Sequence, residues 1–277
     1  PATLLELIQN YLHLQKNTEK VYDPNSGDLV EKESNVFIFP RFHQLDVVRS
    51  LLDGVRREGV GKNYLVQHSA GSGKSNSIAW LAHQLASFYQ QDADTERLFD
   101  SIIVVTDRRV LDQQLQNTIK QFEQVPGVVK KIDKNSAQLR DALESGKAII
   151  ITTLQKFPVI SKSMTELQGQ RFAVIIDEAH SSQSGESSKH LKKTLSVGID
   201  QAEVADETGD DTEDKIIAEI RTRGPQNHIS YFAFTATPKN KTLELFGRKD
   251  ANEQFVAYHI YSMRQAIEEG FILDVLK

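Results

Sequence analysis

Cysteine is absent from all 277 residues of the chain, and its absence excludes several kinds of chemistry at once. Disulfide bonds, zinc sites with thiolate ligands, iron–sulfur clusters and cysteine nucleophiles all need the missing side chain. The chain also lacks any uninterrupted apolar run near the ~18 residues that a membrane-spanning helix requires, so we expect no membrane partner. The lack of thiols fits a reducing cytosol.

An excess of positive charge is missing as well, since 33 Lys and Arg stand against 38 Asp and Glu for a net charge of −5. This total argues against a surface that is basic all over, but it says nothing about local basic patches. Eight of the acids fall within residues 200–214, which contain no Lys or Arg; without them the net charge becomes +3. We expect an acidic surface insertion here. The alternative is an electrostatic guard that keeps nucleic acid away from one face.

The order of apolar segments predicts an α/β fold. Apolar residues at helical spacing from Leu4 to Leu14 predict a helix, and the cluster from Asp23 to Asp28 predicts a turn. Beyond Phe39, runs of β-branched residues alternate with amphipathic segments, which is typical of βαβ units and a mainly parallel sheet buried on both faces. The predicted strands are Tyr64–Gln67, Ile102–Thr106, Ala148–Thr152, Phe172–Asp177 and Ile229–Phe234. Helices are expected from Val110 to Phe122 and near Ser136–Glu144.

The clearest motif is the run His68-Ser69-Ala70-Gly71-Ser72-Gly73-Lys74-Ser75, between a predicted strand and a predicted helix. This context is the one that a phosphate-binding loop requires. Gly71 and Gly73 let the backbone turn its N–H groups toward phosphate oxygens, Lys74 supplies a positive charge, and the Ser75 hydroxyl can ligate Mg²⁺. His68 replaces the first glycine of the general motif. The simpler alternative is a glycine-rich turn with an incidental Lys-Ser pair.

Two adjacent carboxylates end the predicted strand that begins at Phe172. We expect Asp177 to hold Mg²⁺, Glu178 to orient and deprotonate the attacking water, and His180 to sense the γ-phosphate of ATP. The carboxyl edge of an open α/β sheet is where its ligands bind. A solvated strand end is the plain alternative for these residues taken alone.

Four further segments combine groups that suit nucleotide or nucleic acid. Phe42 can stack on adenine and the amide of Gln44 can read its edge, although a plain helix N-terminus is the favoured explanation for these residues taken alone. Hydroxyl, amide and cationic side chains at strand ends can hold phosphates of a nucleic-acid backbone, or simply cap helices. These candidate DNA-contact and coupling residues are Thr106, Asp107, Arg108, Arg109, Thr152, Thr153, Gln155, Lys156, Thr235, Ala236 and Thr237.

With these motifs assembled, the chain resembles the ATP-dependent motors of helicase superfamily two from Phe39 to about Pro238. Gln44 resembles the adenine-reading glutamine, Asp177-Glu178-Ala179-His180 the Asp-Glu-x-His box, and Thr235-Ala236-Thr237 the coupling motif. A narrower resemblance, to the restriction subunit of type I restriction-modification enzymes, covers nearly the whole chain. It is carried by runs beginning at Phe42, Gln67, Thr106 and Tyr261.

The resemblance implies a bacterial, cytoplasmic protein that moves double-stranded DNA with ATP and Mg²⁺, and that docks on methyltransferase and specificity subunits. Residues 36–260 would be the first RecA-like motor domain. Residues 1–35 would be a connecting helix and turn from a nuclease domain, and residues 261–277 the start of the connection to a second RecA-like domain.

Since Pro1 is not Met and the last residues stop within an element, we expect a piece of a longer protein. Glu31-Lys32-Glu33 is too short for the nuclease signature and is expected to lack its strand, so we assign no cleavage to these residues. Another superfamily two enzyme, or a non-hydrolytic nucleotide-dependent scaffold, are the alternatives.

Overall fold

The central feature of the computed structural model is a seven-stranded sheet in the order β11-β3-β8-β7-β4-β6-β5, in which every described pairing is parallel. Residues 2–22, 28–89, 96–106, 109–123, 127–132, 138, 141–143, 145–153, 157–167, 169–177, 212–224 and 226–272 are described. Its strands are β3 (Asn63–His68), β4 (Ser101–Thr106), β5 (Val129–Lys131), β6 (Ile149–Thr153), β7 (Phe172–Ile176), β8 (Ile229–Thr235) and β11 (His259–Tyr261).

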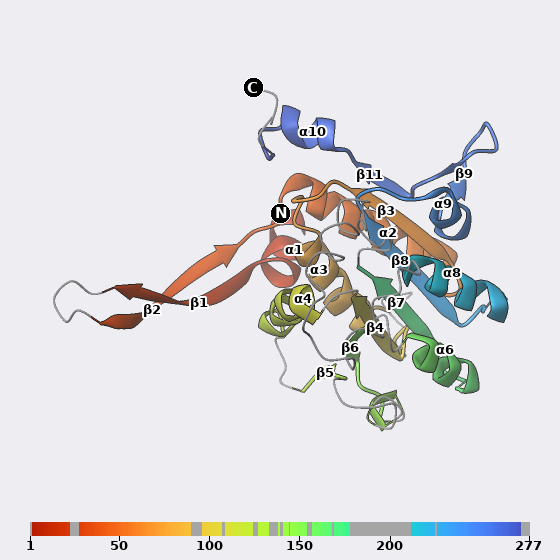
Figure 1. Cartoon of the computed structure of the whole chain (residues 1–277), viewed down its shortest axis with the longest axis horizontal. Helices are drawn as coiled ribbons and strands as arrows, with labels where there is room; N and C mark the ends of the chain where they lie inside the picture. The colour runs from red at the N-terminus through yellow and green to blue at the C-terminus, as the bar shows by residue number, and fades with distance from the viewer. Residues whose placement is uncertain are drawn as a thin grey trace, which may run out of the picture.

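Helices cover both faces of this sheet (Figure 1). On one face lie α2 (Phe42–Glu58), α3 (Lys74–Ala86) and α4 (Arg109–Gln121), and on the other lie α6 (Phe157–Glu166), α8 (Thr212–Arg223) and α9 (Asn240–Phe246). Alternate residues of one strand enter different cores: Ile102 and Val104 pack with the α2–α4 side, and Ile103 and Val105 with the α6–α9 side. This is the three-layer α/β arrangement that the sequence predicts, and it is RecA-like.

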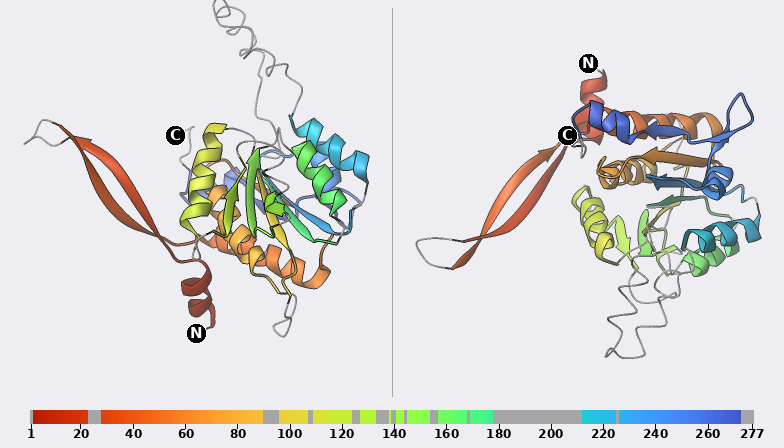
Figure 2. Two further views of the ribbon diagram at one scale, coloured as in Figure 1. Left: turned by 90° about the horizontal axis from the view of Figure 1, so that it is seen from below. Right: turned by 45° about the horizontal axis from the view of Figure 1, so that its top comes forward.

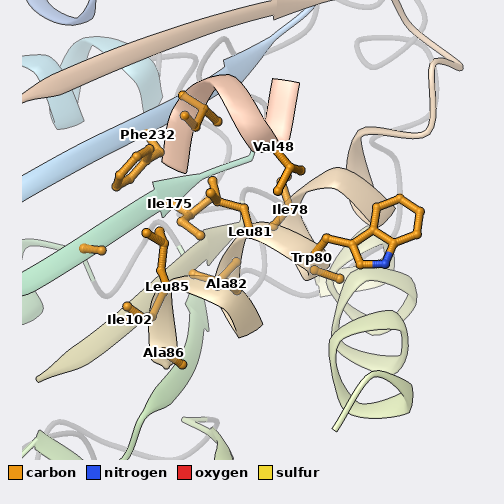
Figure 3. Packing of buried hydrophobic residues seen from close by; sticks show 14 of the residues in the cluster. Val48, Ile78, Trp80, Leu81, Ala82, Leu85, Ala86, Ile102, Ile175 and Phe232 are labelled. Atoms are coloured by element: carbon orange, nitrogen blue, oxygen red, sulfur yellow. The ribbon is translucent and has the colours of Figure 1, made fainter. Parts of the chain in front are cut away.

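The larger core surrounds α3. Figure 3 shows Ile78, Leu81, Ala82 and Leu85 of this helix directed toward Ile102, Ile175 and Phe232 of the sheet. Each of these seven side chains is fully buried. Because central parallel strands are buried on both faces, their sequences are continuous apolar runs without a polar side. That property explains why all five predicted strands lie within one residue of the observed bounds.

The N-terminal segment differs from the expected helix, and the turn expected from Asp23 to Asp28 lies outside the described residues apart from Asp28. Helix α1 covers only Ala2–Asn10, and the chain continues as β1 (His13–Tyr22) and β2 (Leu29–Ile38), an antiparallel ribbon that projects from the body (Figures 1 and 2). The predicted helix to Leu14 is therefore wrong at its end, where Leu12 and Leu14 belong to the base of the ribbon. Glu31–Glu33 lie inside β2, contrary to our expectation that this run has no strand.

The remaining elements close the C-terminal side: β9 (Arg248–Lys249) pairs with β10 (Phe255–Val256), and α10 (Met263–Glu268) follows β11. The ion pair of Arg248 with Glu58 (2.8 Å) ties this part to α2. No helix in the described ranges is both long and apolar enough to cross a membrane. Of the helix expected near Ser136–Glu144, residues 138 and 141–143 are described, and they are helical. The acidic segment 200–214 lies outside the described residues, apart from the start of α8 at Thr212.

Candidate active site

The candidate site lies along the carboxyl edge of the sheet, because every strand of the sheet runs in the same direction. In the pairing register Gln67 is opposite Thr235, Ile176 opposite Val105, and Thr106 opposite Thr153. Asp177 is fixed next to the end of β4 by its backbone N–H, which donates to the carbonyl of Val105 at 2.9 Å. The fold thus brings the phosphate loop, Asp177 and the strand-end threonines to one edge.

The phosphate loop connects β3 to α3. Gly71 and Gly73 have φ angles of 78° and 76°, a left-handed conformation that favours glycine. A Cβ atom on Gly73 would come within 2.4 Å of the amide nitrogen of Gln44. The sequence expectation that these two glycines permit the turn is therefore matched by the backbone.

The side chains of the loop suit an anionic ligand. Lys74 is 8% exposed, with its Nζ 3.4 Å from the carbonyl oxygens of His68 and Ser69. The buried hydroxyls of Ser69 and Ser72 have no hydrogen-bond partner among the described residues. Buried polar groups without partners are uncommon in native proteins. Two free hydroxyls beside a lysine and the N-terminus of a 13-residue helix fit phosphate oxygens.

Helix α2 packs its first turn against this loop. The side-chain amide of Gln44, 4% exposed, donates to the carbonyls of Ser72 (3.4 Å) and Gly73 (3.1 Å) and accepts from the Arg41 backbone N–H (2.9 Å). Phe42, in contrast, is 76% exposed. The structure therefore places the two candidate adenine contacts differently: Gln44 is held on the loop and Phe42 faces solvent.

The candidate DNA-contact residues divide by burial. Thr106, Thr152 and Thr235 are buried, Thr153 and Ala236 are half-buried, and Thr237 is exposed. Arg109 begins α4. The remaining predicted residues, Asp107, Arg108, Gln155, Lys156, Glu178 and His180, lie outside the described residues, as does Ala179 between the last two.

Sequence reasoning missed a group of side chains behind the loop. His43 donates from Nε2 to the Ser72 carbonyl (2.9 Å) and stacks on Tyr261 with ring centroids 3.9 Å apart. The Nε2 of His68 lies 2.8 Å from the Nδ1 of His259. Burial lowers the pKa of His68 to about 2, with smaller effects from His259, His43 and Lys74. No periodicity indicates these contacts, which join residues 29 positions apart in the case of His43 and Ser72 and 191 in the case of His68 and His259.

Comparison of the sequence with known protein families identifies the family of the chain. The sequence profile of the SWI2/SNF2 ATPases matches residues 43–276, which is most of the chain. The chain belongs to the SWI2/SNF2 ATPase family. Its nucleotide site is therefore expected where this SWI2/SNF2 domain places the phosphate loop, between β3 and α3.

A curated relative of this SWI2/SNF2 ATPase domain is the type I restriction enzyme HindI endonuclease subunit of Haemophilus influenzae, 30% identical over 233 residues. The match covers 80% of this chain and 18% of that subunit, so the chain spans about a fifth of its relative. The sequence resemblance to type I restriction subunits is thereby confirmed.

Among solved structures, a nuclease-deletion mutant of the type ISP restriction-modification enzyme LlaGI, in complex with a DNA substrate mimic, superposes with a TM-score of 0.52. The superposition covers 84% of this chain and 20% of that one at 13% identity, so it bears on the fold alone. A Sulfolobus solfataricus SWI2/SNF2 ATPase core in complex with double-stranded DNA is 17% identical over 73% of this chain and 34% of that chain, with a TM-score of 0.41.

Proposed function

We propose that the chain is the ATP-binding half of the DNA-translocating motor of a type I restriction enzyme subunit. The observation that carries this proposal is the common edge at which Lys74, Ser75 and Asp177 meet, in a domain of the SWI2/SNF2 family. The 30% identity to the HindI subunit favours a restriction enzyme over other motors of this class. Cleavage belongs to a separate nuclease domain.

Each group at this edge has a distinct role. ATP·Mg²⁺ supplies the phosphoryl group, and Ser75 and Asp177 would hold the metal. Lys74, with Ser69 and Ser72, binds phosphate oxygens and offsets their charge. Glu178 orients the attacking water and accepts its proton. Phe42 covers the adenine, and Gln44 reads it by exchanging its bonds to Ser72 and Gly73 for bonds to the base.

The DNA groove would run across the strand ends. Thr153 and Thr237 are the strand-end threonines that reach the surface, so we assign backbone phosphate contacts to them, together with Arg108, Arg109, Gln155 and Lys156. Buried Thr106, Thr152 and Thr235 instead link these contacts to the nucleotide edge, with Thr235 accepting from the backbone N–H of Thr237 (3.3 Å). The partners are double-stranded DNA and the methyltransferase and specificity subunits, in the bacterial cytoplasm.

The test is Glu178→Gln in the intact protein. Removing the proton acceptor while keeping the shape should leave ATP binding unchanged and lower turnover at least about 100-fold, since general-base catalysis contributes about 10²–10⁴ in rate. Glu244→Gln makes the same exchange on the exposed side of α9 and serves as the control. Undiminished hydrolysis in Glu178→Gln would refute the role of Glu178.

A further inference from the structure

A chain of three side chains connects the base of the phosphate loop to helix α2. His68, the last residue of β3, is fully buried, and its Nε2 lies 2.8 Å from Nδ1 of His259 in β11. The other nitrogen of His259, Nε2, lies 3.0 Å from a carboxylate oxygen of Asp46 in α2. The partly buried imidazole of His259 therefore joins β11 to both β3 and α2.

Asp46 orients the imidazole of His259. A carboxylate oxygen only accepts hydrogen bonds, so Nε2 of His259 donates to Asp46. In the tautomer whose single proton is on Nε2, Nδ1 of His259 accepts and His68 donates from its Nε2. His68 is neutral in this assignment, which agrees with its pKa being strongly lowered by burial. The positive charge of Lys74 adjoins this imidazole, with Nζ 3.4 Å from the carbonyl oxygen of His68.

A second bridge holds the other end of the loop. The Nε2–H of His43 donates to the carbonyl of Ser72, and the ring stacks on Tyr261 at an interplanar angle of 10°. Tyr261 accepts from the backbone N–H of Ser69 through its carbonyl (2.9 Å) and donates its hydroxyl to Glu269 (2.7 Å). The backbones of Ser69 and Ser72 are therefore both hydrogen-bonded to elements outside the loop.

We propose that His259 and His43 are positioning residues that hold the phosphate loop in its nucleotide-binding shape, an inference that rests on the proposed ATP site. A loop fixed before binding loses less conformational freedom when phosphates arrive, so its affinity is higher. His259 acts through His68, and His43 acts through the carbonyl of Ser72. Neither side chain needs to touch the nucleotide.

Two substitutions of His259 separate positioning from packing. His259→Leu fills the space without an acceptor, whereas the side-chain oxygen of His259→Asn keeps one near the position of Nδ1. For the whole 277-residue chain, titrated calorimetrically with Mg·ATP, we expect the Leu variant to bind about tenfold more weakly, the effect of losing about one hydrogen bond. The Asn variant should recover most of that loss.

The matched control is His228→Leu. His228 is also partly buried and bonds one carbonyl, that of Met164 (3.3 Å), but it precedes β8 at the opposite edge of the sheet. This variant should unfold at a lower temperature and yet bind Mg·ATP as the unchanged chain does.

Three results distinguish the possibilities. Equal Mg·ATP affinity in the unchanged chain and His259→Leu would overturn the positioning role, and so would equal losses in His259→Leu and His228→Leu. No binding by the unchanged chain would contradict the proposed ATP site itself. The inference is supported if only the His259 variants bind Mg·ATP more weakly than the unchanged chain, and if His259→Leu loses more affinity than His259→Asn.

Discussion

Burial of the His68 imidazole couples the stability of the domain to pH. The unfolded chain binds a proton near the ordinary histidine pKa of about 6.5, whereas the folded chain resists protonation down to about 2. Between these values the unfolded state holds more protons, so stability is present above pH 6.5 and is lost as the pH falls. Desolvation lowers the pKa of His43, His13 and His83 as well.

We therefore expect acid to destabilise the chain, with His68 contributing about 2 kcal/mol between pH 8 and pH 5. His68→Gln removes that contribution, so its unfolding free energy should fall less over the same interval, whatever its value at pH 8. Urea titrations of both chains at pH 8, 6.5 and 5 measure the difference. Parallel pH dependences would show that His68 is protonated as readily when folded as when unfolded.

At the same scale, sequence reasoning identified the phosphate loop but not its support. Gly71 and Gly73 are recognisable because their conformation is a local property of the backbone. His43, Asp46 and His259 carry no comparable signal, because their roles come from hydrogen bonds between α2, β3 and β11 that only the fold creates. The same limit applies to Gln44, whose bonds to the loop the sequence does not indicate.

Among the elements, the central strands carry most of the core. Ile175 of β7 is fully buried against α3, while Ile260 of the edge strand β11 is 53% exposed (Figure 3 shows the former). Truncation of a buried aliphatic side chain loses the free energy gained by removing it from water and leaves a cavity in the core. Truncation of an exposed side chain loses less of this free energy and leaves a smaller cavity or none.

The same substitution at both positions should therefore have unequal effects. Ile175→Ala should lower the unfolding free energy by about 2–5 kcal/mol, and Ile260→Ala by less than about 1 kcal/mol. Denaturant unfolding with a common m-value measures both. Similar losses at the two sites would mean that β7 is not the centre of the folded core.

Elements were predictable in proportion to their burial. The five predicted strands lie in the interior of the sheet, where apolar runs are unbroken. The ribbon β1–β2 was missed because its strands pair only with each other in the described structure and carry mainly polar residues from Lys16 to Lys20. β11 spans three residues, too few for a pattern. The predicted N-terminal helix was too long because Leu12 and Leu14 continue the helical spacing of apolar residues, whereas the helix itself ends at Asn10.

On the scale of the whole molecule, the described residues form one RecA-like sheet, whereas the motors that the chain resembles use two such domains. In related phosphoryl transfers an arginine supplied from a second domain is worth about 10³–10⁵ in rate. The proposed function assigns these 277 residues the binding half of the site, with Lys74 and Asp177.

We accordingly expect the 277-residue chain to bind Mg·ATP and to hydrolyse it negligibly, even with double-stranded DNA present. A coupled assay for phosphate release, with the intact protein as the positive control, measures this directly. Robust DNA-stimulated turnover by the chain alone would show that its catalytic groups are complete.

In the proposed function, ATP bound at this loop drives movement along double-stranded DNA, and displacement of a labelled third strand from a DNA triplex measures that movement. The intact protein should release the third strand only with ATP, and Lys74→Ala, which removes the phosphate-binding charge, should release none. Release without ATP, or release by Lys74→Ala at the rate of the unchanged protein, would show that ATP at this loop does not drive movement along DNA.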